Sequence, residues 1–126
     1  MKMRKKMLMM ITCTLLLVLI AGLVAQAAAS TVVLSRGKYS AYTGTVGLST
    51  VGYIYGRCDS SSSDHIYMKL DYSAPGRGWS NKFDTNVAPG AGLPKTKRTD
   101  PTAGSWRGFI RSGNMNASGW VEVSTT

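Results

Sequence analysis

Residues 7–24 of this 126-residue chain carry no charge, and this run limits what the chain can become. Four basic residues stand among the six positions before it. Behind it lie two overlapping small-x-small triplets, Ala25-Gln26-Ala27 and Ala27-Ala28-Ala29. A basic start, an apolar middle and a small-residue exit form the pattern of a secretory signal peptide. We therefore expect residues 1–29 to be a cleavable signal and residues 30–126 a single mature domain.

An uncleaved membrane anchor is the alternative, because eighteen uncharged residues reach the lower limit of a spanning helix. The alanine-rich exit and the Ala21-Gly22 break favour cleavage, either after Ala27 or after Ala29. The exported protein would then begin at Ala28 or Ser30. The compact basic start is typical of bacterial signals, so we expect a secreted or extracellular protein, free or associated with the cell surface.

Removal of the signal changes the composition of the working protein. Of fifteen basic residues four leave with the signal, while all six acidic residues stay, so eleven against six give a net charge of +5. Cys13 also leaves, which makes Cys58 the one remaining cysteine and excludes an intramolecular disulfide. A domain of this length buries about 65% of its unfolded surface, enough for one core.

The mature sequence shows the periodicity of strands. No window of eleven residues places apolar side chains at i, i+3, i+4 and i+7, whereas Gly, Ser, Thr and Tyr are frequent. Residues 65–72 alternate between an apolar and a polar set, which predicts a strand at 66–72. Residues 106–111 and 120–123 alternate in the same way and predict the last two strands.

Further strands are expected at residues 31–35, 44–50, 51–58 and 79–87. Turn-forming residues separate them, and residues 112–119 have the composition of a hairpin connection. About seven short strands without a helix predict an all-β fold, a small antiparallel β-sandwich or a small barrel.

The longest stretch without a strand signal is residues 89–104. It holds three prolines and the basic group Lys95-Thr96-Lys97-Arg98. A loop of this length in a compact domain is usually functional or disordered. We therefore predict a basic loop here.

Few residues offer catalytic or metal chemistry. Cys58 and His65 bracket a six-residue polar loop and would face each other if that loop closed a hairpin, which is the arrangement that a nucleophile and its general base need. A small apolar core residue and a surface histidine are the favoured interpretation. Asp59 and Asp64 lack the glycine and the terminal glutamate of an EF-hand loop, so they predict a solvated turn. We expect no metal, no cofactor and no enzymatic activity.

Positive charge is concentrated in one part of the mature chain. Between residues 77 and 111 two acidic residues are outnumbered by seven basic ones, Arg77, Lys82, Lys95, Lys97, Arg98, Arg107 and Arg111. Alternation places Arg107 and Arg111 on one face of a strand. A basic strand face beside a basic loop predicts a binding patch for an anionic polymer, with solubility alone as the competing explanation.

The aromatic residues favour the binding patch. More aromatic area is present than a core of this size can enclose, so some rings must be exposed to solvent; the residues are Tyr39, Tyr42, Tyr53, Tyr55, Tyr67, Trp79 and Trp120. We therefore expect a non-enzymatic module that binds anionic cell-wall polymers, polysaccharides or sugars, with a membrane surface as a further partner and no nucleic acid. The alternative is a secreted antimicrobial or toxin-like protein that acts on the membranes of competitors.

Overall fold

The computed structural model describes residues 27–126, so nearly all of the expected signal sequence lies outside the described residues. The described part is all-β and antiparallel, which confirms the predicted fold class. No helix in this part is long and apolar enough to span a membrane. The strands are β1 (Ala29–Leu34), β2 (Ser40–Tyr42), β3 (Val46–Cys58), β4 (Ile66–Ser73), β5 (Ser80–Val87), β6 (Gly92–Ser112) and β7 (Gly119–Ser124).

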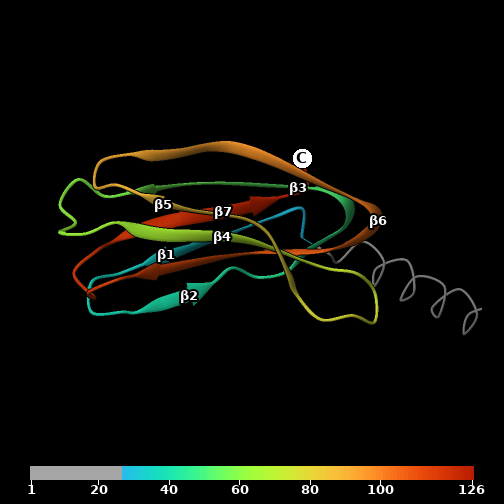
Figure 1. The fold of residues 1–126 in the computed structure, drawn as a ribbon, viewed down its shortest axis with the longest axis horizontal. Helices are drawn as coiled ribbons and strands as arrows, with labels where there is room; N and C mark the ends of the chain where they lie inside the picture. Colours follow the sequence, from blue (N-terminus) through green and yellow to red (C-terminus); the bar gives the residue numbers. More distant parts are fainter. Residues whose placement is uncertain (1–26) are drawn as a thin grey trace, which may run out of the picture.

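The two longest strands, β3 and β6, join two layers into a β-sandwich. The strand order is β1-β7-β3-β6-β4-β5, and β2 also pairs with β6. Residues 92–99 of β6 pair with residues 51–57 of β3, whereas residues 105–112 pair with β4 and residues 109–111 with β2. The start of β3 also reaches the second half of β6, where Val46 pairs with Trp106 and Ser49 with Gly104. Figure 1 shows β6 running along the molecule, turning at one end and running back. One layer therefore holds β1, β7, β3 and the first half of β6, and the other holds β2, the second half of β6, β4 and β5.

A bulge accompanies the turn of β6. Ser49 pairs with Gly104 and Val51 with Thr99, so β6 advances five residues while β3 advances two. The additional residues, 100–103, project from the end of the sandwich, and bulges bend the strand that carries them. This bend carries β6 from one layer into the other.

The predicted loop at residues 89–104 is wrong, because most of it belongs to β6. The loop was predicted because prolines are rare within strands. Pro94 and Pro101 cannot donate a backbone hydrogen bond, but within the described residues this half of β6 pairs only with β3 and leaves its other edge unpaired. Proline is tolerated on such an edge. The basic group at residues 95–98 is therefore strand, with alternating side-chain directions.

The predicted strand positions are mostly confirmed, whereas the predicted hairpin is wrong. Strands predicted around residues 31–35, 66–72, 79–87, 106–111 and 120–123 are confirmed within one or two residues at each end, or as part of a longer strand. The strands predicted at 44–50 and 51–58 are one continuous strand, β3, and β2 was not predicted. The hairpin predicted at residues 112–119 is wrong, because β6 and β7 are not paired and the connection crosses between layers.

The core lies between the two layers. Alternate residues of β3 and β7, including Ile54 and Val121, face alternate residues of β4 and β6, including Met68 and Ile110, and all four are fully buried. The layers approach most closely at glycines. A side chain on Gly56 would lie 2.8 Å from Met68 Sδ, and one on Gly52 would overlap the ring of Trp106. The outer faces of the two layers are therefore on opposite sides of the molecule.

Candidate functional site

The seven basic residues expected to form one patch are divided by the fold. Arg107 and Arg111 lie in the half of β6 that pairs with β4, whereas Lys95 and Lys97 lie in the half that pairs with β3. Their two groups therefore belong to opposite layers. Arg77 lies in the connection between β4 and β5.

Lys82 and Arg98 lie where the edges of the two layers meet. The Lys82 ammonium is 2.7 Å from Asp100 Oδ2, and the Arg98 guanidinium lies 4.6 Å from the centre of the Phe83 ring. Each contact joins β5 of one layer to β6 of the other. These two cations therefore hold the sandwich together and are poor candidates for ligand contacts.

The outer face of the second layer carries a connected row of rings and guanidinium groups. We call this the aromatic face and define it by Tyr42, Tyr67, Trp79, Phe109, Arg107 and Arg111. In the sheet Tyr42 stands opposite Phe109 and Tyr67 opposite Arg111, so β2, β6 and β4 present these side chains side by side. Trp79 joins the row from the β4–β5 connection, immediately before β5.

Arg107 holds the first part of the row. Its guanidinium carbon lies 4.3 Å from the centre of the Tyr42 ring and 4.2 Å from that of Trp79, so the cation contacts both aromatic rings. Arg107 Nε also donates to Asp71 Oδ2 at 3.4 Å. The Asp71 side chain is only 3% exposed, and the Lys69 ammonium is likewise 3.4 Å from it. Arg107 is therefore paired with a buried carboxylate that it shares with Lys69, and it contacts two rings of the face.

Phe109 and Tyr67 continue the row toward Arg111. The Phe109 ring centre is 4.7 Å from that of Tyr42 and 6.3 Å from that of Tyr67. The Arg111 guanidinium lies 4.7 Å from the Tyr67 ring centre, and no carboxylate among residues 27–126 pairs with it. Arg111 is thus an exposed cation beside an aromatic surface.

Polar groups border the row. The Tyr67 hydroxyl donates to Asp84 Oδ2 at 2.9 Å, and partial burial together with this carboxylate raises the pKa of Tyr67. The phenol therefore stays protonated at neutral pH, and because its one proton is donated to Asp84, its oxygen can only accept from a ligand. The exposed ring areas belong mainly to Tyr42, which is 48% exposed, and to Trp79, which is 38% exposed. A flat ligand with hydroxyl groups and negative charge would find rings, donors and a free guanidinium on this face.

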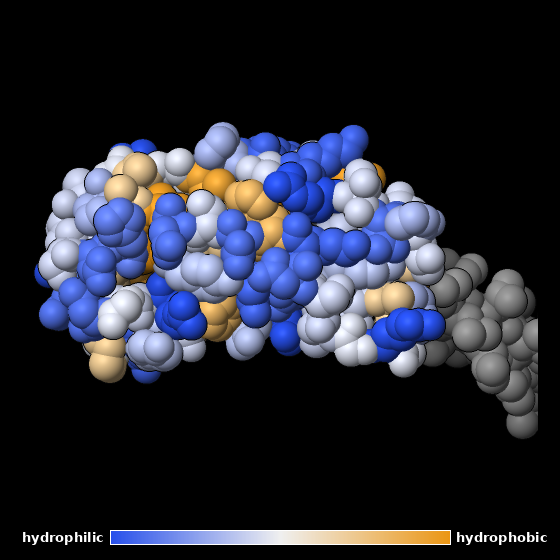
Figure 2. Space-filling model, viewed as in Figure 1, coloured by the Kyte–Doolittle hydropathy of each residue, from blue (hydrophilic) through white to orange (hydrophobic). Residues whose placement is uncertain are grey.

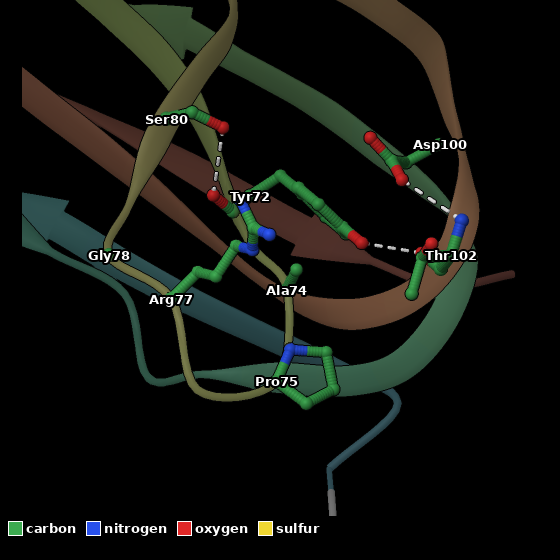
Figure 3. A pocket seen from close by; sticks show the side chains of 8 residues that line it. All are labelled: Tyr72, Ala74, Pro75, Arg77, Gly78, Ser80, Asp100 and Thr102. Atoms are coloured by element: carbon green, nitrogen blue, oxygen red, sulfur yellow. Dashed lines mark hydrogen bonds between the residues drawn. The ribbon is translucent and has the colours of Figure 1, made fainter.

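A cleft of about 680 Å³ opens beside the aromatic face, between the β4–β5 connection and the β6 bulge. Figure 3 shows Arg77 and Tyr72 directed into it, with Asp100 and Thr102 on the opposite wall. The Tyr72 hydroxyl donates to the Thr102 carbonyl, and Asp100 Oδ1 accepts from the Thr102 amide at 3.0 Å.

Asp100 is the most strongly held acidic group of this cleft. The hydrogen bond from Lys82 lowers the pKa of the Asp100 carboxyl, and the Thr102 amide adds to the effect. Burial, together with the negative charge of the nearby Asp100 carboxylate, raises the pKa of Tyr72. Because these polar groups bind one another, they close this end of the sandwich and leave mainly Arg77 for a ligand.

The pairing considered for Cys58 and His65 does not form. Cys58 pairs with Gly119 of β7, and β3 is not a neighbour of β4. The thiol is fully buried and lies 3.7 Å from the carbonyl oxygen of Asp64, whereas His65 is exposed. Among residues 27–126 no group of three or more His, Cys, Asp or Glu side chains could hold a metal ion.

The comparisons with known proteins show similarity of fold at a low level. The sequence matches no family model and no curated protein. A solved structure of the Yersinia pseudotuberculosis-derived mitogen is 17% identical with a TM-score of 0.47, covering 79% of this chain and 84% of that one. PirA is 8% identical with a TM-score of 0.49, covering 79% and 94%.

A chitosan-binding module from a chitosanase/glucanase of Paenibacillus sp. IK-5 is 15% identical with a TM-score of 0.43, covering 74% of each chain. At these scores the similarity assigns no ligand to this chain.

Proposed function

We propose that this protein is an exported, non-enzymatic module that binds an anionic polysaccharide of the cell envelope through the aromatic face. The observation that carries the proposal is the continuous row in which Arg107 and Arg111 alternate with Trp79, Tyr42 and Tyr67. Aromatic rings offer flat apolar area for the C–H faces of sugar rings. Guanidinium groups bind carboxylate and phosphate in a bidentate geometry.

The residues of the row have different roles in this proposal. Trp79 and Tyr42 supply stacking area, because they are the most exposed rings of the face. Arg111 supplies the charge, because no carboxylate of the described chain neutralises it. Arg107 positions the two rings and is held by Asp71.

Action on membranes has less support. The exposed non-aromatic hydrophobic side chains, Val33, Leu48 and Met115, lie on β1, on β3 and between β6 and β7, on separate elements. The exposed rings Tyr42 and Trp79 share the aromatic face, but charged groups lie between them. In Figure 2 the hydrophobic areas of the visible face are small and interrupted by hydrophilic residues. A membrane-inserting surface needs a larger contiguous apolar patch.

The test is binding of the mature protein to immobilised polygalacturonate, which carries carboxylates, and to wall teichoic acid, which carries phosphates. Trp79→Ala and Arg111→Glu should each weaken binding by about tenfold, or about 1.4 kcal/mol. Lys38→Glu, the matched charge reversal in the exposed β1–β2 turn, should bind like wild type. Binding should also weaken as salt rises from 50 to 500 mM, because exposed charges are screened over about 8 Å at physiological salt.

Two results would overturn the proposal. Equal binding by wild type, Trp79→Ala and Arg111→Glu would show that the aromatic face is not the site. Leakage of dye from liposomes, without binding to either polymer, would favour the toxin-like alternative. Preference for one polymer would identify the anion.

A further inference from the structure

We infer that the opposite layer carries a second binding face for the same class of anionic polysaccharide, which makes the protein bivalent; this inference rests on the proposed function. The second face is defined by Tyr53, Tyr55, Arg57, Lys95, Lys97 and Trp120. It contains two of the residues that the sequence placed in a single patch, Lys95 and Lys97.

The register of the first layer brings these side chains together. Tyr53 stands opposite Lys97 of β6, and Arg57 stands opposite Trp120 of β7. The Trp120 and Tyr55 rings are 5.5 Å apart between centres and nearly perpendicular, at 88°. The Lys95 ammonium lies 4.8 Å from the centre of the Tyr53 ring. Rings and cations therefore alternate here as they do on the aromatic face.

This face points away from the aromatic face. The intervening residues of β3, Ile54 and Gly56, are buried against the other layer, where Met68 lies. Side chains alternate along a strand, so Tyr53, Tyr55 and Arg57 point outward from the sandwich. A polymer on one face therefore cannot contact the other face without passing around the molecule.

The charge of the second face suits a polyanion. Three cations, Arg57, Lys95 and Lys97, stand against one nearby carboxylate, Glu122, which accepts a hydrogen bond from the Thr31 hydroxyl at 2.7 Å. Lys97 is exposed, and no carboxylate of residues 27–126 pairs with it. The aromatic face has Lys69, Arg107 and Arg111 against two carboxylates, Asp71 and Asp84. The second face therefore has one fewer carboxylate side chain for the same number of cations.

Two binding faces on one sandwich would make the protein able to bridge polymer chains, which a single face cannot do. A single molecule can hold two polymer chains, and on a dense polymer the second contact forms at high effective concentration. The protein would therefore cross-link envelope polymer as well as attach to it.

The experiment is a capture assay with monomeric protein, its state checked by sedimentation. Beads carry sparse polygalacturonate, are loaded with protein and washed, and then receive fluorescent polygalacturonate. Wild type should bind the beads and capture labelled chains. The Lys95→Glu/Lys97→Glu variant should still bind the beads but capture at least fivefold fewer labelled chains, and Trp79→Ala/Arg111→Glu should do the same. Arg36→Glu/Lys38→Glu, with the same change of charge in the β1–β2 turn, should capture like wild type.

The outcomes separate the two proposals. If wild type binds the beads but captures no labelled chain, or if Lys95→Glu/Lys97→Glu captures as much as wild type, the second face is not a site while the proposed function stands. If Trp79→Ala/Arg111→Glu behaves as wild type and Lys95→Glu/Lys97→Glu loses all bead binding, the first layer is the sole site, and both the proposed aromatic face and bivalency are wrong. The Lys95 ammonium also donates to the Thr126 oxygen at 2.6 Å, so replacing Lys95 removes a contact within the protein. The single variant Lys97→Glu leaves that contact intact and serves as the control for it.

Discussion

Arg107 and Arg111 are four residues apart on the same face of β6, yet truncating them should have very different effects on stability. Arg107→Ala leaves Asp71 with Lys69 as its sole cationic neighbour, 3.4 Å away, and the Asp71 side chain is 3% exposed. Removing the single partner of a buried charge costs about 3–5 kcal/mol. Because Lys69 remains and Arg107 is itself partly exposed, about half of that applies here.

Lost stacking adds to this effect. Arg107 contacts two rings, Tyr42 and Trp79, and an exposed cation–π contact contributes about 0.5–1 kcal/mol. The expected destabilisation is therefore about 2.5–4.5 kcal/mol, a large part of the 5–15 kcal/mol typical of a domain. Arg111→Ala, which removes one exposed contact with Tyr67, should destabilise by about 0.5–1 kcal/mol at most.

Urea unfolding followed by tryptophan fluorescence measures both values. With a slope of about 1–2 kcal/mol/M for a domain of this size, the midpoint of Arg107→Ala should fall by about 1–4 M. The double variant Asp71→Asn/Arg107→Ala should recover part of the loss, because the buried charge is then removed with its partner. Equal midpoints for Arg107→Ala and Arg111→Ala would refute the role assigned to Asp71.

Three further predictions concern the fold. Asp100→Asn removes a carboxylate whose pKa is lowered by Lys82, so the stabilisation from this carboxylate is present above the unfolded pKa of about 4 and is lost as pH falls through the lower folded pKa. The melting temperatures of variant and wild type should therefore differ most near pH 6 and converge toward pH 2. A difference that stays constant with pH would contradict this prediction. Gly52→Ala should destabilise by about 1–3 kcal/mol in urea unfolding, and by less when Trp106 is also replaced by leucine, because the new methyl overlaps that buried ring. Cys58→Ser should lower stability by about 1 kcal/mol and leave polymer binding unchanged, and loss of binding in a folded variant would show a role for the thiol.

The strands could be predicted where one face is buried and the other is wet. Residues 66–72 show this alternation, and β4 lies there, with Ile66, Met68 and Leu70 fully buried. Asp71 departs from the pattern, because the polar side of β4 should be solvated whereas Asp71 is buried beneath two cations. Its burial depends on Arg107, which is 36 positions away in the sequence and reaches it only through the pairing of β4 with β6.

The first half of β6 could not be predicted from local sequence. Its prolines, and the absence of alternating apolar and polar residues, are as compatible with an unpaired strand edge and a bulge as with a loop. The contacts that define the bend come from elsewhere in the chain, since Lys82 pairs with Asp100 and the Tyr72 hydroxyl donates to Thr102. The aromatic residues of the candidate site could be predicted only in part. An excess of aromatic residues predicts that some rings are exposed to solvent, but it does not indicate which rings share a face of the sandwich.

The bend of β6 also decides how charge should be counted in this protein. Of seven cations that are close in sequence, Lys82 and Arg107 are paired with carboxylates, which offset their charge, whereas Arg98 keeps its charge but is half-buried and packed on Phe83. Arg111 on one layer and Lys95 and Lys97 on the other remain exposed, and one to three screened cations per face support only modest affinity. Strong attachment to a polymer therefore requires either stacking on the rings or simultaneous use of both faces, and linking two weak sites can raise the overall affinity by about 10²–10⁴. Since the fold separates the cations instead of concentrating them, a polymer-binding role depends on the rings and on bivalency more than on the net charge of the chain.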